Sequence, residues 1–97
     1  MNENNVNVKE TIENVLEEAG RIIYGDREKT YGHPSKNLRV IAELWNAYLG
    51  NEVCLTAHDV CVMMILLKAA RLKNTPGHRD STVDICGYAA LIERCAE

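Results

Sequence analysis

Apolar residues recur three or four positions apart along most of the chain, and no segment shows the two-residue alternation of a half-buried strand. This spacing predicts an all-α protein folded as a compact four-helix bundle. The four helices are expected over residues 7–24, 35–49, 57–73 and 80–96.

Residue types at the predicted helix ends support these boundaries. Asn7 belongs to the class that caps helix N-termini, and Gly25 is suited to close the first helix. Ser35 is expected to cap the second helix in the same way. Thr56, followed three residues later by Asp59, predicts a capping box at the start of the third.

The third predicted helix, residues 57–73, is apolar on every side as far as Leu67. A helix of this kind is a central one, buried either by neighbouring helices or by a second subunit. The third and fourth helices together hold more apolar surface than two other short helices can cover. We therefore expect a symmetric dimer or a larger closed assembly.

Length and charge restrict the class of protein. The 97 residues predict a single domain over residues 7–97, preceded by a disordered N-terminus at residues 1–6. A net charge of −3 argues against binding of long nucleic acid, which requires clustered cations. No apolar run is long enough to cross a membrane, so a cytoplasmic protein is expected. The four cysteines lack zinc-site spacing and are expected to behave as buried thiols.

The strongest chemical signal lies at the start of the fourth predicted helix, whose N-terminus carries a partial positive charge. Four cationic or titratable side chains flank it. They are Lys68, Arg71, His78 and Arg79. Such a site prefers an anion, and phosphate or pyrophosphate fits best. The alternative is purely structural, because Ser81 and Asp84 also form a capping box.

Acidic and aromatic residues follow on the same predicted helix. Asp84 and Tyr88 are one turn apart and share a face with Leu91, so they are expected to line the inner wall of the anion site. A buried carboxylate requires a cation, a metal or several hydrogen-bond donors. Asp80 and Asp84 therefore either hold the arginines in place or bind the Mg²⁺ that accompanies a polyphosphate.

Two other segments offer candidate residues. In the predicted loop over residues 25–35, Lys29, Tyr31 and His33 supply donors for an anion, and the alternative is a plain connector between helices. The first helix carries an acidic face that includes Glu18. We interpret this face as solvated, with a metal-binding role as the alternative.

Several segments of the sequence resemble a family of small domains found in bacteriophages and prophages. They are residues 26–34 (DREKTYGHP), 41–50 (IAELWNAYLG), 78–81 (HRDS) and 84–89 (DICGYA). The resemblance covers nearly the whole chain after residue 20. It implies a protein that acts in the cytoplasm of the bacterial host.

The fourth predicted helix is also similar to one in the MazG-like all-α nucleoside triphosphate pyrophosphatases. Those enzymes bind Mg²⁺ through an E-x-x-E pair on one helix and an E-x-x-D pair on another, and they cut between the α and β phosphates. In this chain Ser81 stands where the second pair has its Glu, and the second predicted helix offers only Glu43 for the first pair. The resemblance implies Glu43, Asp80 and Asp84 as metal ligands.

Three functions follow from these observations. The first is a phage protein that binds a small phosphorylated nucleotide and sequesters it, for example a cyclic nucleotide signal of host defence. The second is a Mg²⁺-dependent nucleotide pyrophosphatase with a reduced site, in which Lys68, Arg71 and Arg79 hold phosphates. The third is an interaction module that inhibits a host protein. Dependence of ligand binding on Mg²⁺ separates the second from the first, and absence of nucleotide binding favours the third.

Overall fold

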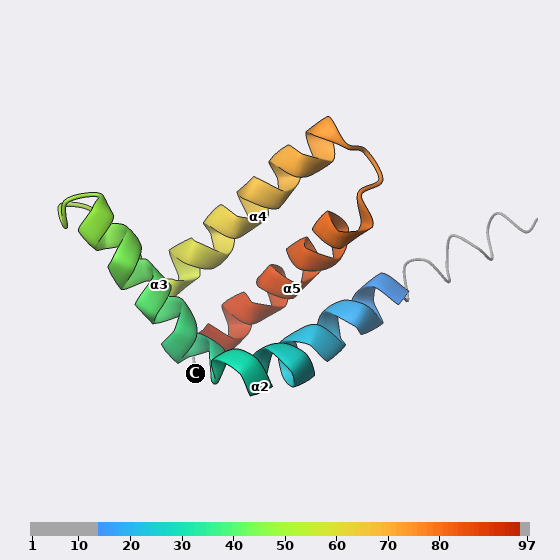
Figure 1. Ribbon diagram of the computed structural model, residues 1–97, viewed down its shortest axis with the longest axis horizontal. Helices are drawn as coiled ribbons and strands as arrows, with labels where there is room; N and C mark the ends of the chain where they lie inside the picture. Colours follow the sequence, from blue (N-terminus) through green and yellow to red (C-terminus); the bar gives the residue numbers. More distant parts are fainter. Residues whose placement is uncertain (1–13, 96–97) are drawn as a thin grey trace, which may run out of the picture.

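The computed structural model describes residues 14–95, and every secondary-structure element in that range is a helix (Figure 1). Residues 14–21 form the first helix. It is followed by the π-helical turn η1 (Ile22–Asp26) and the α-helices α2 (Arg27–Tyr31), α3 (Pro34–Tyr48), α4 (Ala57–Asn74) and α5 (Arg79–Cys95). The all-α prediction is confirmed. The cap expected at Asn7 and the disorder expected at residues 1–6 lie outside the described residues.

Gly25 does not end the first helix, although the sequence predicted that it would. The turn η1 carries the helical path through this glycine, and α2 continues it to Tyr31. A π turn inserts one extra residue and so rotates the positions that follow it. Ile22 and Ile23, which are adjacent in the chain, both pack inward at this turn, in different apolar clusters. The loop expected over residues 25–35 is therefore mostly helical.

The start of α3 also differs from the prediction. His33 is the N-cap in place of Ser35, and its Nδ1 atom accepts a hydrogen bond from the Ser35 backbone N–H at 3.2 Å. Pro34 explains the shift, because proline suits the first position of a helix and favours extended backbone in the residue before it. His33 has that extended backbone, with φ of −64° and ψ of 134°.

The start of α4 is as predicted, with a capping box between Thr56 and Asp59. The Asp59 N–H donates to the Thr56 hydroxyl at 3.2 Å, and the Thr56 N–H donates to the Asp59 carboxylate at 2.9 Å. The backbone hydrogen bond from Thr56, assisted by its hydroxyl, holds the pKa of Asp59 below its ordinary value of 3.8. Asn46 fixes the approach to this cap through two hydrogen bonds to the Leu55 backbone, at 2.8 and 3.0 Å.

The hydrophobic core lies where α3, α4, α5 and η1 meet, and the most extensive helix contact is between α4 and α5 (Figure 1). The buried residues of this core are Ile23, Leu38, Ala42, Val60, Cys61 and Leu91. A second, smaller cluster joins the first helix to α5. It consists of Val15, Ala19 and Val83. The first helix therefore packs along α5, and the side chains between these two elements form the site described below.

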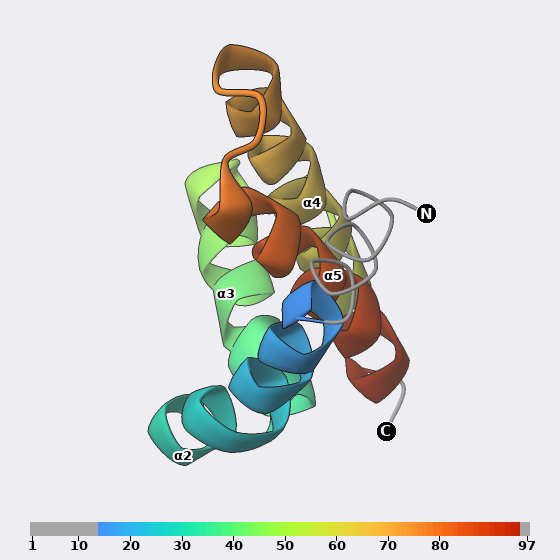
Figure 2. The ribbon, with the colours of Figure 1, turned by 90° about the vertical axis from the view of Figure 1, so that its right-hand side faces the viewer.

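The helix α4 is not buried on every side by its neighbours, so of the two expected arrangements burial by neighbouring helices is not observed, and burial by a second subunit is still a prediction. Val60 and Cys61 are its only buried residues. Its exposed large apolar residues are Val62, Met63, Leu66 and Leu67. Among the described helices α4 contacts α3 and α5, and its buried residues Val60 and Cys61 share one cluster with residues of both (Figure 2). None of the helices within residues 14–95 combines the length and the hydropathy that a membrane span requires.

Candidate functional site

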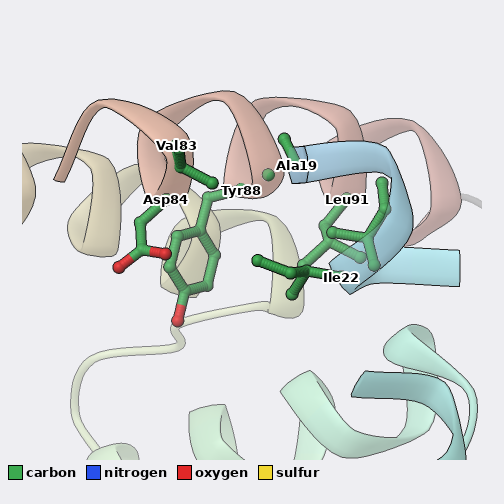
Figure 3. Close-up of a pocket in the computed structure, with 8 residues that line it drawn as sticks. Ala19, Ile22, Val83, Asp84, Tyr88 and Leu91 are labelled. Carbon is green, nitrogen blue, oxygen red and sulfur yellow. The ribbon is translucent and has the colours of Figure 1, made fainter. Parts of the chain in front are cut away.

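A cavity of about 170 Å³ lies between the first helix and α5 (Figure 3). Its lining residues are Ala19, Ile22, Ile23, Val83, Asp84, Gly87, Tyr88 and Leu91. The side chains that line it are apolar except for the Asp84 carboxylate and the Tyr88 hydroxyl, which extend toward the same side of α5 in Figure 3. Asp84, Tyr88 and Leu91, which the sequence places on one helix face, all line this cavity.

Gly87 shapes the cavity by lacking a side chain. It is buried in α5, and a β-carbon added to it would lie 3.5 Å from Cγ2 of Ile23, an ordinary contact distance. Glycine inside a helix is less stable than alanine by about 0.5–1 kcal/mol. A methyl group would fit at this position and would stabilise α5, so the glycine leaves open a volume that alanine would fill.

The partner of the Asp84 carboxylate is Lys68 of α4. Their Oδ2 and Nζ atoms are 2.9 Å apart, and the Lys68 side chain is only 12% exposed whereas that of Asp84 is 35% exposed. Lys68 is therefore the cation that was expected beside a half-buried aspartate. It occupies Oδ2 and leaves Oδ1 of Asp84 able to accept a hydrogen bond from a ligand.

The N-terminus of α5 is capped by His78. The His78 Nδ1 atom accepts a hydrogen bond from the Ser81 backbone N–H at 3.3 Å and lies 2.8 Å from the Ser81 hydroxyl oxygen. The capping box expected of Ser81 with Asp84 does not form. The turn at Gly77, with φ of 83°, starts the helix one residue earlier than predicted, so that Ser81 is buried and Asp84 is free to pair with Lys68.

Arg79 joins α5 to the first helix through Glu18. One of its guanidinium nitrogens lies 3.2 Å from Oε2 of Glu18, and the carboxylate of Glu18 is also 3.8 Å from Arg21. The Glu18 Oε2 atom is buried yet makes no hydrogen bond, so its attraction to Arg79 is mainly coulombic. The charge pattern of the first helix predicts a solvated face for Glu18, but the position of Glu18 next to Ala19 on the apolar stripe was the signal for an inward role.

The predicted phosphate ligands do not form a single cluster. Arg71 and His78 line one hollow of about 190 Å³ at the connection between α4 and α5. Lys29, Tyr31 and His33 are exposed on and after α2, which lies at the other end of α5 in both views (Figures 1 and 2). The two groups that the sequence proposed therefore occupy opposite ends of the molecule.

The three predicted metal ligands lie on two helices. Glu43 is exposed on α3, Asp80 is exposed in the first turn of α5, and Asp84 is paired with Lys68. Within residues 14–95 no group of three His, Cys, Asp or Glu side chains is arranged to hold a metal ion. A Mg²⁺ site is therefore still a prediction from the sequence resemblance.

The amino-acid sequence matches a known protein family. Residues 14–96 match the sequence profile of the family described as a domain of unknown function (DUF6378). The chain belongs to this family. It is 49% identical over 85 residues to the Gene 55 protein of Mycobacterium phage D29, an alignment that covers 88% of this chain and 55% of the relative.

A second relative supports the phage resemblance. The Gene 55 protein of Mycobacterium phage L5 is 46% identical over 80 residues, which cover 82% of this chain and 51% of the relative. This chain thus spans about half the length of the curated relatives it matches, and the predicted likeness to a bacteriophage domain family is confirmed. No solved structure matches the chain significantly.

Proposed function

We propose that this domain binds a small phosphorylated nucleotide, with the base in the cavity lined by Asp84 and Tyr88. The observation that supports this proposal is the combination of apolar walls with one carboxylate and one phenol. Ligand pockets are mainly apolar, with a few polar groups that fix orientation. The Asp84 Oδ1 atom would accept a base N–H, and the Tyr88 ring offers a flat apolar face.

The size of the cavity supports a single ring system as its occupant. Its volume of about 170 Å³ is close to that of an engineered protein cavity of about 150 Å³ that binds benzene. A whole nucleotide exceeds this space. In the proposed complex the base enters the cavity, and the sugar and phosphates lie outside it.

Cations around α5 would hold the phosphates. Arg79 is nearly half exposed and is held by Glu18 through an interaction without a hydrogen bond, so a phosphate can compete for its guanidinium group. Arg71 and His78 offer a second cationic position at the helix connection. Lys68, which is bound to Asp84, would instead hold the base-binding carboxylate in position.

The cellular role is proposed from the relatives. Both are phage proteins, so we propose that the domain acts in the cytoplasm of the bacterial host and sequesters a nucleotide signal of host defence. Hydrolysis by a reduced MazG-like site with Mg²⁺ is the alternative. It predicts that ligand binding depends on Mg²⁺ and that a nucleoside triphosphate is converted to the nucleoside monophosphate and pyrophosphate.

The deciding experiment measures nucleotide binding to two glycine variants. Gly87→Ala adds a methyl group to the cavity wall, and Gly20→Ala adds one to the first helix where no atom lies within 4 Å. Both substitutions should stabilise the free protein by about 0.5–1 kcal/mol. A panel of linear and cyclic nucleotides, with and without Mg²⁺, should raise the melting temperature of the wild type and of Gly20→Ala. The rise should be much smaller for Gly87→Ala.

The cationic part of the site is tested separately. Arg79→Ala should weaken nucleotide binding more than tenfold, the equivalent of a lost charge-assisted hydrogen bond of about 1.5–3 kcal/mol. Arg21→Ala, which removes the other arginine near Glu18, is the matched control. If no nucleotide shifts the melting temperature of the wild type, or if Gly87→Ala binds as tightly as Gly20→Ala, the proposal is wrong.

A further inference from the structure

The outer face of α4 and the end of α3 form one apolar surface, which we call the α3–α4 patch. It consists of Leu44, Tyr48, Leu49, Val62, Met63, Leu66 and Leu67, whose exposed fractions range from 36% to 91%. A groove of about 310 Å³ connects its two parts, since Trp45, Tyr48 and Leu49 of the α3 end line it together with Met63 of α4. The patch is therefore continuous between the two helices.

The groove marks the point where the core of the single chain ends. Leu38, Ala42, Trp45 and Leu49 follow the helical spacing of one face of α3. Leu38 and Ala42 are buried, but Leu49 on the same face is half exposed, because α3 diverges from α4 toward its C-terminal end (Figure 1). An apolar helix face that continues beyond its own core requires another surface to cover it.

The area of the patch is large enough for one side of a small interface. The seven exposed fractions correspond to about four fully exposed large side chains, or on the order of 600 Å² at roughly 150 Å² each, the lower limit for an aromatic side chain. Typical monomers expose a largest apolar patch of about 300–600 Å². Stable interfaces bury about 800 Å² on each partner.

The charge of the patch favours a second copy as the occupant. Between Val60 and Ala70 the one charged residue of α4 is Lys68, and it is turned toward Asp84 of α5. A symmetric interface places each surface against itself, so an uncharged apolar surface can pair where a charged one would be repelled. We infer that two copies of this chain associate through the α3–α4 patch. This inference does not depend on nucleotide binding.

Molar mass in solution tests the inference without any nucleotide. Sedimentation or light scattering of the wild type should give twice the 10.9 kDa of the chain. Leu66→Glu introduces facing negative charges into the α4 part of the patch and should weaken self-association by roughly 30-fold or more. Tyr48→Lys introduces facing positive charges at the α3 end and should weaken self-association in the same way, and the Tyr48 side chain is 91% exposed and contributes little to folding of the single chain.

The control is Ala89→Glu, which adds the same charge at an exposed position of α5 outside the patch and should leave the dimer intact. Circular dichroism should show equal helix content in all three variants, and Tyr48→Lys keeps the test valid if Leu66→Glu unfolds. A wild type that stays monomeric at all concentrations overturns the inference and leaves a host protein as the occupant. A dimer that survives both patch substitutions overturns it as well.

Discussion

Single side chains join helices that are far apart in this sequence. Lys68 reaches from α4 to Asp84 of α5, and Arg79 reaches from α5 to Glu18 of the first helix. The two pairs differ in burial, because Lys68 is almost enclosed whereas both members of the second pair are substantially exposed. Exposed pairs contribute at most about 1 kcal/mol, so the Lys68 pair should matter more to stability.

Removing one member of the Lys68–Asp84 pair should destabilise the protein more than removing both members. Asp84→Asn leaves a nearly buried ammonium group without its counter-charge and should lower the free energy of unfolding by about 1–3 kcal/mol, less than for a fully buried pair because Asp84 is partly exposed. The double variant with Lys68→Met should recover part of the loss. Urea denaturation measures both, and a double variant less stable than Asp84→Asn alone would contradict the explanation.

Asp59 should make the start of α4 sensitive to acid. The pKa of Asp59 is lowered in the folded state, so the ionised carboxylate stabilises the fold at pH values above the ordinary pKa of 3.8. This contribution to the free energy of unfolding is lost as the pH falls below 3.8 and through the lower pKa of the folded state. Asp59→Ala should therefore destabilise the protein at neutral pH, and its difference from the wild type should shrink under acid. Asp80→Ala, in the first turn of α5, is the control for a general helix-dipole effect, and it should reduce the free energy of unfolding less than Asp59→Ala does. If the stability difference between Asp59→Ala and the wild type did not change with pH, the ionised carboxylate of Asp59 would not be its cause.

Among the helices, α3 and α5 begin at histidines, a residue type that is not among the preferred helix N-caps. Two histidines, His33 and His78, accept backbone N–H groups at the starts of α3 and α5. The turn η1 is held by Arg94, whose guanidinium group lies 4.8 Å from the centre of the Tyr24 ring and donates to the Ile23 carbonyl at 3.4 Å. The three hydrogen bonds each satisfy a backbone group at a helix terminus or at the irregular turn.

Substitution of His33 tests the importance of these caps. His33→Ala removes the acceptor for the Ser35 N–H and should lower the free energy of unfolding by about 0.5–2 kcal/mol. His33→Asp restores an acceptor that is also favoured by the helix dipole, and it should be at least as stable as the wild type. Thermal and urea unfolding of the three proteins give the comparison. Equal stability of the alanine and aspartate variants would mean that Pro34 alone defines this helix start.

For the whole molecule, the arrangement of α3 and α4 links stability to association. If a second copy covers the α3–α4 patch, the folded dimer is favoured by mass action. The melting temperature of the wild type should then rise with protein concentration, whereas that of Tyr48→Lys should not. Scanning calorimetry over a wide concentration range measures this, and an unchanging wild-type melting temperature would argue for a stable monomer.

The helical class, the approximate span of three helices and the cap of α4 could be predicted from the sequence alone. These features depend on local spacing and on contacts within one turn, so that Thr56 and Asp59, three residues apart, carry all the information needed. The sequence also predicted that Asp84, Tyr88 and Leu91 lie on one face of α5, because their spacing matches the period of a helix.

The partners that these residues contact could not be predicted, because they depend on the fold. The pairing of Asp84 with Lys68, the contact of Arg79 with Glu18 and the π turn at Ile22 and Ile23 all depend on how separate helices pack. The same holds for the separation of Lys29 from Arg71, since both are cations near helix ends and only the fold places those ends apart. Local patterns specify a helix face, whereas the choice of neighbour for that face is made by long-range packing of the whole core.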